Sequence, residues 1–126
     1  MVYATDLAAE AASNNLFRKI LETTASLQLG LMTLVPGETT GVEKHTDKEQ
    51  MFFVVSGELS LQVGGVSFSL SKGGAAIVPR STFHEIWCER NAAEPARLFT
   101  LYSTKEHDCA ETQERSTVKE MHAPAD

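Results

Sequence analysis

The most informative segment of this chain is residues 36–58, PGETTGVEKHTDKEQMFFVVSGE. Glu43 and His45 are two positions apart, so on a β-strand both side chains point to the same face. The polar run 46–49 predicts a tight reversal, after which Gln50 begins a strongly apolar strand. This reversal can bring Gln50 back opposite His45. A carboxylate, an imidazole and an amide oxygen then meet where two strands face one another, which predicts the beginning of a metal site.

A further histidine lies in a second stretch, GGAAIVPRSTFHEIWC, residues 73–88. His84 of this stretch is the distant imidazole that the first three donors lack, provided that folding brings the two stretches together. The remaining histidines, His107 and His122, lie in no comparable pattern. We predict that these two are not ligands.

Together the two stretches resemble the two signature motifs of the cupin superfamily, small β-barrels that hold a metal in the barrel mouth. The first motif reads glycine, five residues, His-x-His, a short gap, an acid, six residues and glycine. Its positions are filled by Gly37, Glu43, His45, Gln50 and Gly57. The second motif reads glycine, five residues, Pro-x-Gly, two residues and histidine. Its positions are filled by Gly73, Pro79, Ser81 and His84.

The spacing of both motifs is kept, whereas four identities differ. Glutamate stands at 43 for a histidine, glutamine at 50 for an acid, serine at 81 for a glycine and cysteine at 88 for an asparagine. The chain is also similar to the small single-domain cupins described as mannose-6-phosphate isomerase-like, several of which carry Glu-x-His followed by Gln. The resemblance therefore implies a ligand set that is typical of a subfamily. Its members here are Glu43, His45, Gln50 and His84, with Gln50 either completing the set or binding a ligand or water from outside it.

This donor set narrows the metal to a divalent first-row ion. Two imidazoles and one carboxylate with open positions serve non-haem Fe(II) oxygenases, and the same set accepts Mn, Co, Ni, Cu or Zn. Glutamate in place of histidine makes the site harder and more anionic, which favours Fe or Mn. With one carboxylate the metal site keeps a net charge of about +1, which would attract an anionic or enolate-forming substrate.

Short alternating apolar runs extend over most of the chain and predict an all-β fold. Strands are expected at 17–21, 27–35, 51–55, 59–63, 66–70, 75–78, 84–89 and 97–103. Nearly even spacing and glycine turns, Gly64-Gly65 above all, favour an antiparallel barrel or sandwich. With the resemblance, we expect a single-domain antiparallel double-stranded β-helix, or jelly roll. It would comprise an N-terminal segment 1–15 with a short helix at 6–12, a barrel domain 16–103 and a polar C-terminal tail 104–126.

Within this scheme some positions carry finer expectations. Phe52, Val54, Ile86 and Cys88 share strand faces with the candidate ligands and are expected to point inward. Residues 75–78 are expected to form a buried strand. Arg18 and Lys19 are expected to lie on a solvated edge. For the tail we leave three alternatives open: a capping helix, a strand exchanged with a partner, or a largely solvated segment.

The composition excludes several classes of partner. With 126 residues the chain fits one domain. A formal net charge of −6 argues against binding to nucleic acid or an anionic membrane surface, which need a basic footprint. The first seventeen residues contain no Lys or Arg, so no secretory or transit signal is indicated and we expect a cytoplasmic protein. Cys88 and Cys109 lack the spacing of a disulfide framework or zinc knuckle.

Three functional interpretations follow. The first is a metal-binding cupin that acts on or binds a small molecule in the barrel mouth, by oxygenase- or isomerase-type chemistry. A metal-dependent dioxygenase and a sugar or sugar-phosphate isomerase are both consistent with this interpretation. The second is a metal-free small-molecule binding or sensing module without catalysis. The third is a structural or partner-binding protein whose exposed sheet dimerises and whose pocket is filled by side chains. By resemblance to other cupins, a homodimer is expected.

Overall fold

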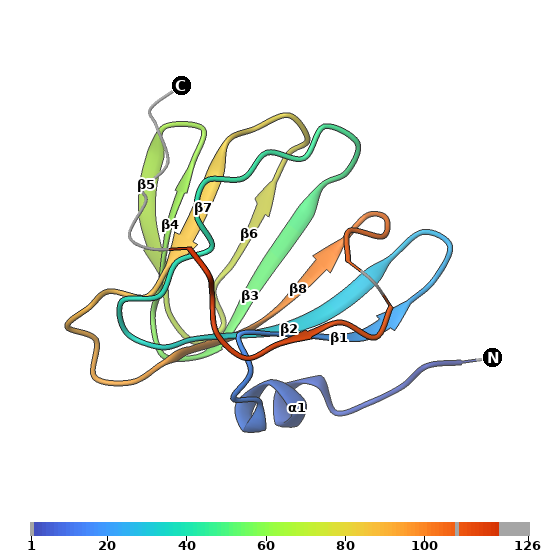
Figure 1. Ribbon diagram of the computed structural model, residues 1–126, viewed down its shortest axis with the longest axis horizontal. Coiled ribbons are helices and arrows are strands. Elements are labelled where there is room, and N and C mark those ends of the chain that lie inside the picture. Colours follow the sequence, from blue (N-terminus) through green and yellow to red (C-terminus); the bar gives the residue numbers. More distant parts are fainter. Residues whose placement is uncertain (1, 108, 119–126) are drawn as a thin grey trace.

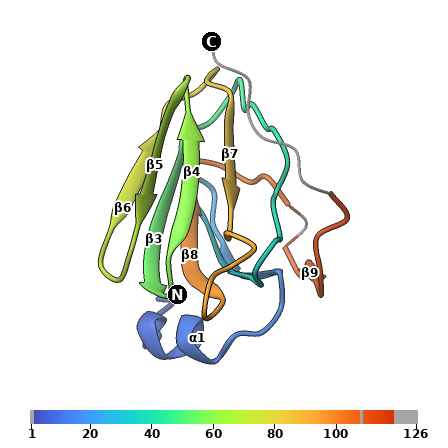
Figure 2. The same cartoon turned by 90° about the vertical axis from the view of Figure 1, so that its left-hand side faces the viewer.

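Two antiparallel β-sheets pack face to face in the computed structural model, which describes residues 2–107 and 109–118. The larger sheet has the strand order β6-β3-β8-β2-β1-β9 and the smaller β5-β4-β7 (Figures 1 and 2). The strands of the larger sheet are β1 (Arg18–Thr23), β2 (Gln28–Leu34), β3 (Gln50–Ser56), β6 (Ala75–Val78), β8 (Ala96–Tyr102) and β9 (Thr112–Gln113). Those of the smaller are β4 (Leu59–Val63), β5 (Val66–Leu70) and β7 (His84–Trp87). The predicted all-β architecture is confirmed.

The core lies between the sheets and follows the period of two that the sequence shows. On β3 and β8 alternate residues are buried, and they face one another in register, Phe52 beside Thr100 and Val54 beside Leu98. From the smaller sheet Leu59, Leu61 and Ile86 complete the core. The residues expected to point inward, Phe52, Val54, Ile86 and Cys88, are all at most 1% exposed.

A short helix precedes the barrel, as the sequence predicts. Helix α1 (Leu7–Ser13) begins after Asp6, whose carboxylate accepts a hydrogen bond from the backbone N–H of Ala9. After the helix, Asn14 is buried, and its amide donates to the carbonyl of Leu16 and to Thr33 Oγ1. These bonds fix the helix below β2 and β8 (Figure 1). None of the helices among the described residues is long and apolar enough to cross a membrane.

Two of the finer expectations are wrong. Strand β6 is not buried: it forms one edge of the larger sheet, and Ile77 on its outer face is 66% exposed. Arg18 does not lie on a solvated edge either. It pairs with Met32 on the inner face of the sheet and is 9% exposed, because β9 covers the edge that β1 would otherwise present to solvent.

The segment after β8 returns over the barrel. Its strand β9 pairs with β1 of the same chain, and the N–H groups of Phe17 and Ile20 donate to the carbonyls of Glu114 and Glu111. It then continues to Ser116, whose hydroxyl donates to the carbonyl of Thr39 in the segment between β2 and β3. The described part of the tail thus includes a short strand that pairs with β1 of the same chain. His122 lies outside the described residues, and the domain boundaries stay a prediction.

Candidate metal centre

Glu43 is held against the start of β7 by a pair of backbone hydrogen bonds. The N–H of Glu43 donates to the carbonyl of His84 at 2.8 Å, and the N–H of His84 donates back at 2.9 Å. The strand that the sequence predicts for Glu43 and His45 does not form; segment 36–49 touches β7 through two isolated bridges, at Thr39 and at Glu43. The bridge at Glu43 brings the two motifs together, since it joins a residue of the first motif directly to His84 of the second motif.

Ser81 occupies the position where the second motif has a glycine, and its backbone explains that preference. Ser81 has φ +62° and its N–H donates to the carbonyl of His45 at 2.6 Å. A left-handed backbone costs a residue with a Cβ about 1–2 kcal/mol, which glycine avoids. The loop thus ties His45 to the approach of His84 at some cost in stability.

We expect Ser81→Gly to stabilise the fold by about 1 kcal/mol, because glycine relieves the strain but also gains entropy when unfolded. Urea unfolding measures the change. The matched control is Ser69→Gly, inside β5, which should destabilise the fold by roughly 0.5–1 kcal/mol. Equal effects of the two substitutions would contradict the assignment of strain to position 81.

The donor atoms of Glu43, His45 and His84 lie within 4.8 Å of one another. His84 Nε2 is 3.9 Å from Glu43 Oε1, and the two imidazole ring centroids are 5.2 Å apart. Two ligands that each bind one ion at about 2.1 Å can be no more than about 4.2 Å apart. The three donors therefore need only a small inward movement to share an ion.

A hydrogen bond of His84 and an ion-pair contact of His45, each at the far side of its ring, indicate which imidazole nitrogen faces the cluster. His84 Nδ1 lies 3.1 Å from the carbonyl oxygen of Thr82, which only accepts, so Nδ1 carries the proton. His45 Nδ1 lies 3.6 Å from Glu106 Oε1, a carboxylate that likewise favours a proton on Nδ1. In both rings Nε2 is left with a free lone pair, the form in which histidine binds metals.

Three buried atoms of the centre have no hydrogen-bond partner among the described residues: His45 Nε2, His84 Nε2 and Gln50 Oε1. The amide nitrogen of Gln50 donates to Thr100 Oγ1 at 2.9 Å, which leaves the amide oxygen as the free atom. Buried polar atoms are rarely left without a partner, because each costs about 1–3 kcal/mol. Two imidazole lone pairs and an amide oxygen beside a carboxylate fit a divalent cation.

Burial shifts the pKa values of the centre. Desolvation raises the pKa of Glu43 to about 7. The positive charge of Arg18 opposes this rise, and the negative charge of Glu106 adds to it. Desolvation also lowers the pKa of His84, although its hydrogen bond to the Thr82 carbonyl acts in the opposite direction. At neutral pH the His84 imidazole is therefore uncharged and able to donate a lone pair.

The structure adds residues that the sequence reasoning missed. Tyr102 is buried, and its ring meets that of His45 edge to face at 5.9 Å. Glu106 binds the buried ammonium of Lys48 at 2.9 Å, and His107 Nε2 lies 3.3 Å from the Tyr102 hydroxyl. Strand phase could have placed Tyr102 inward, in step with Leu98 and Thr100. No pattern in the polar run 104–107 indicates that it closes over the centre.

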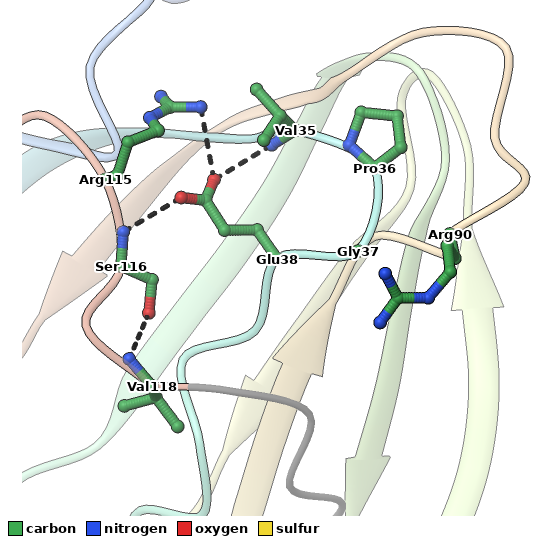
Figure 3. Close-up of a pocket in the computed structure, with 8 residues that line it drawn as sticks. All are labelled: Val35, Pro36, Gly37, Glu38, Arg90, Arg115, Ser116 and Val118. Atoms are coloured by element: carbon green, nitrogen blue, oxygen red, sulfur yellow. Dashed lines mark hydrogen bonds and ion pairs between the residues drawn. The ribbon is translucent and has the colours of Figure 1, made fainter.

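A separate cavity of about 500 Å³ lies between the loop at Pro36 and the C-terminal segment (Figure 3). The carboxylate of Glu38 accepts from the N–H groups of Val35 and Ser116 and pairs with Arg115 at 3.3 Å. The negative charge of Glu38 is thus compensated by contacts within the protein. We assign the cavity's polar residues a structural role, that of fastening the C-terminal segment to the barrel.

Comparisons with known proteins agree with this architecture. The family model described as the cupin domain matches residues 30–102. The uncharacterized protein L612 of Acanthamoeba polyphaga mimivirus is 28% identical over 117 residues, which cover 90% of this chain and 72% of L612. The uncharacterized protein YrkC of Bacillus subtilis is 29% identical over 100 residues, or 75% of this chain, and the match spans only about half of YrkC (53%).

Among solved structures, the crystal structure of BH2720 from Bacillus halodurans superimposes with a TM-score of 0.86 at 24% identity. The superposition covers 90% of this chain and 89% of BH2720, so the likeness extends over nearly the whole fold. At this identity it concerns the fold alone. Because the family model matches more than half of its residues, the chain belongs to the cupin domain family, and its two sheets form the barrel of that family.

Proposed function

We propose that this cupin binds a divalent first-row transition metal through Glu43, His45 and His84 and acts on a small molecule at that metal. The observation that carries the proposal is the set of unpartnered buried atoms, His45 Nε2, His84 Nε2 and Gln50 Oε1, beside the carboxylate of Glu43. Gln50 is the fourth ligand or the hydrogen-bond partner of a molecule bound there. Fe and Mn suit this donor set best, and Zn, Ni, Cu and Co also fit it.

The protein's part in the chemistry is to hold the donors in place. Phe52 packs against His84 at a ring distance of 6.4 Å, and Tyr102 packs against His45. A divalent ion with open positions would supply Lewis-acid polarisation of a substrate oxygen or, as Fe(II), oxygenase chemistry. The preferred reaction types are thus those of a metal-dependent dioxygenase or of a sugar or sugar-phosphate isomerase. The alternative is a metal-free binding or sensing module.

Elemental analysis of protein purified without chelators and without an affinity tag tests the proposal. We expect about one first-row metal ion per chain, taken up again after removal and reconstitution. A protein that stays metal-free after expression in metal-rich medium and after reconstitution would contradict the proposal and favour the alternative module.

Metal affinity should depend steeply on pH because the pKa of Glu43 is raised to about 7 by burial. Below pH 7 the carboxyl is protonated, and a proton must leave before the oxygen can bind an ion, so affinity should fall about tenfold per pH unit. Above pH 7 the carboxylate is already charged, and this dependence should level off. Competition with a chelator between pH 5.5 and 8.5 measures the effect.

The matched control for this experiment is Glu43→Gln, which keeps the shape of the side chain but cannot titrate. Its affinity should be lower at pH 8 and should lose the break near pH 7. A wild-type affinity that is flat from pH 6 to pH 8 would show that Glu43 is already ionised in this range.

We further propose that the protein is a homodimer that pairs through the outer face of the larger sheet. Leu27 and Ile77 are 47% and 66% exposed and border an apolar groove of about 220 Å³ that also includes Met51 and Leu101. Such apolar surfaces often mark contacts between protein chains. Light scattering should give twice the chain mass. Ile77→Lys should give a monomer, whereas Val66→Lys, equally exposed on the other sheet, should not.

A further inference from the structure

Arg18 is a buried arginine inside the barrel. It lies on the inner face of β1, opposite Met32, and only 9% of its surface is exposed. Burial of a guanidinium is costly unless its charge is paired and its N–H groups are hydrogen-bonded. An arginine at this position therefore needs either a complete set of partners or a role.

The partners of Arg18 are incomplete. Both of its described polar contacts use Nη1, which donates to Gln113 Oε1 at 2.8 Å and lies 3.6 Å from Glu111 Oε2. Its Nε is buried with no hydrogen-bond partner in the part of the chain that the structure describes. The carboxylate that pairs with Arg18 is shared, because Glu111 Oε2 is also 3.1 Å from His107 Nδ1. The guanidinium also lies over the ring of Phe17, 5.1 Å from its centroid, and the buried donor left without a hydrogen-bond partner among the described residues is Nε.

A chain of contacts connects Arg18 to the metal centre. Glu111 meets His107, whose other nitrogen lies 3.3 Å from the hydroxyl of Tyr102, and the Tyr102 ring packs on His45. The positive charge of Arg18 also reaches Glu43, where it opposes the rise of the pKa that burial causes.

We propose that Arg18 binds the carboxylate of a small anionic substrate while another oxygen of the same molecule approaches Glu43, His45 and His84. Arginine forms paired N–H···O bonds with carboxylates, and Nε with one Nη nitrogen is one of the edges it uses for them. The substrates that fit are small carboxylic acids with a hydroxyl or keto oxygen nearby. This inference rests on the proposed metal function and specifies its substrate class.

The test compares acids with their neutral amides. Acetate, lactate and malonate, and the corresponding amides, are titrated by calorimetry into wild-type protein, both metal-loaded and metal-free, with the metal content measured in every sample. At least one acid should bind the wild type about 10–100-fold more tightly than its amide, the range expected for hydrogen bonds to a charged group. Arg18→Gln should lose this preference without losing metal, and Arg18→Lys should retain part of it.

The variant Gln113→Ala distinguishes substrate binding by Arg18 from a purely structural role, in which Arg18 only holds the C-terminal segment. This variant removes the same contact to the segment but leaves the guanidinium in place, and it should keep the preference for acids. An unchanged preference in Arg18→Gln, or none in the wild type, would overturn the inference. If no sample binds metal, the metal proposal fails, and the comparison of acid with amide in the metal-free protein still decides the role of Arg18.

Discussion

Metal binding should be lost when His84 is replaced by alanine, with an affinity at least about 100-fold below that of the wild type. This loss should exceed the roughly 10–100-fold that removal of an outer partner of a ligand costs, because His84 Nε2 itself points at the cluster. His84→Ala leaves only the carboxylate of Glu43 and the imidazole of His45. These are too few donors to retain the ion through purification. Elemental analysis measures the metal content of each protein, and chelator competition measures its metal affinity.

The matched control is His107→Ala, because it removes an imidazole of the same size that contacts Tyr102 but is not part of the cluster. It should keep about one ion per chain. Circular dichroism confirms that both variants are folded. Equal metal in wild type and His84→Ala would rule out His84 as a ligand and, with it, the proposed centre.

Gly57→Ala should destabilise this barrel strongly. Gly57 ends the first motif with φ +74°, and a Cβ there would lie 2.1 Å from the carbonyl oxygen of Pro95. Since the neighbour is backbone, the clash cannot be relieved by a rotamer change. Strain of about 1–2 kcal/mol and overpacking of about 1–3 kcal/mol combine to a loss of roughly 3 kcal/mol or more.

Gly73→Ala is the control for this prediction, because Gly73 has φ +86° but a Cβ there would meet nothing within 4 Å. It should cost only the backbone strain, about 1–2 kcal/mol. Urea unfolding gives the free energy of unfolding of both variants. The difference between the two values is the cost of the steric clash at position 57, because both variants carry the backbone strain. A Gly57→Ala protein no less stable than Gly73→Ala would mean that the β3–β4 turn and Pro95 lie farther apart than described.

The sequence was sufficient for the fold and for the cluster of candidate ligands. Alternation of apolar and polar residues identified the inward faces of β3 and β7, since a period of two leaves one face of each strand apolar. Two motifs of fixed spacing singled out Glu43, His45 and His84, which the structure brings together. Their role as ligands stays a prediction.

The sequence did not reveal which strands are edges. The run 75–78 is apolar, and an apolar run predicts burial, yet β6 ends the larger sheet and exposes Ile77. Arg18 was misplaced for the opposite reason, since a charged residue at the start of a strand indicates solvent. Both errors depend on neighbours that are distant in sequence, and β9 in particular is too short and too polar to show a period.

The return of segment 104–118 to β1 sets an order of events during synthesis. A chain that has left the ribosome only as far as β8 already contains Glu43, His45 and His84, but not the partners that bury Arg18 or the carboxylate beside Lys48. Strand β1 then waits for an edge partner that is made about ninety residues later. The finished interior therefore arises only after nearly the whole described chain has been translated.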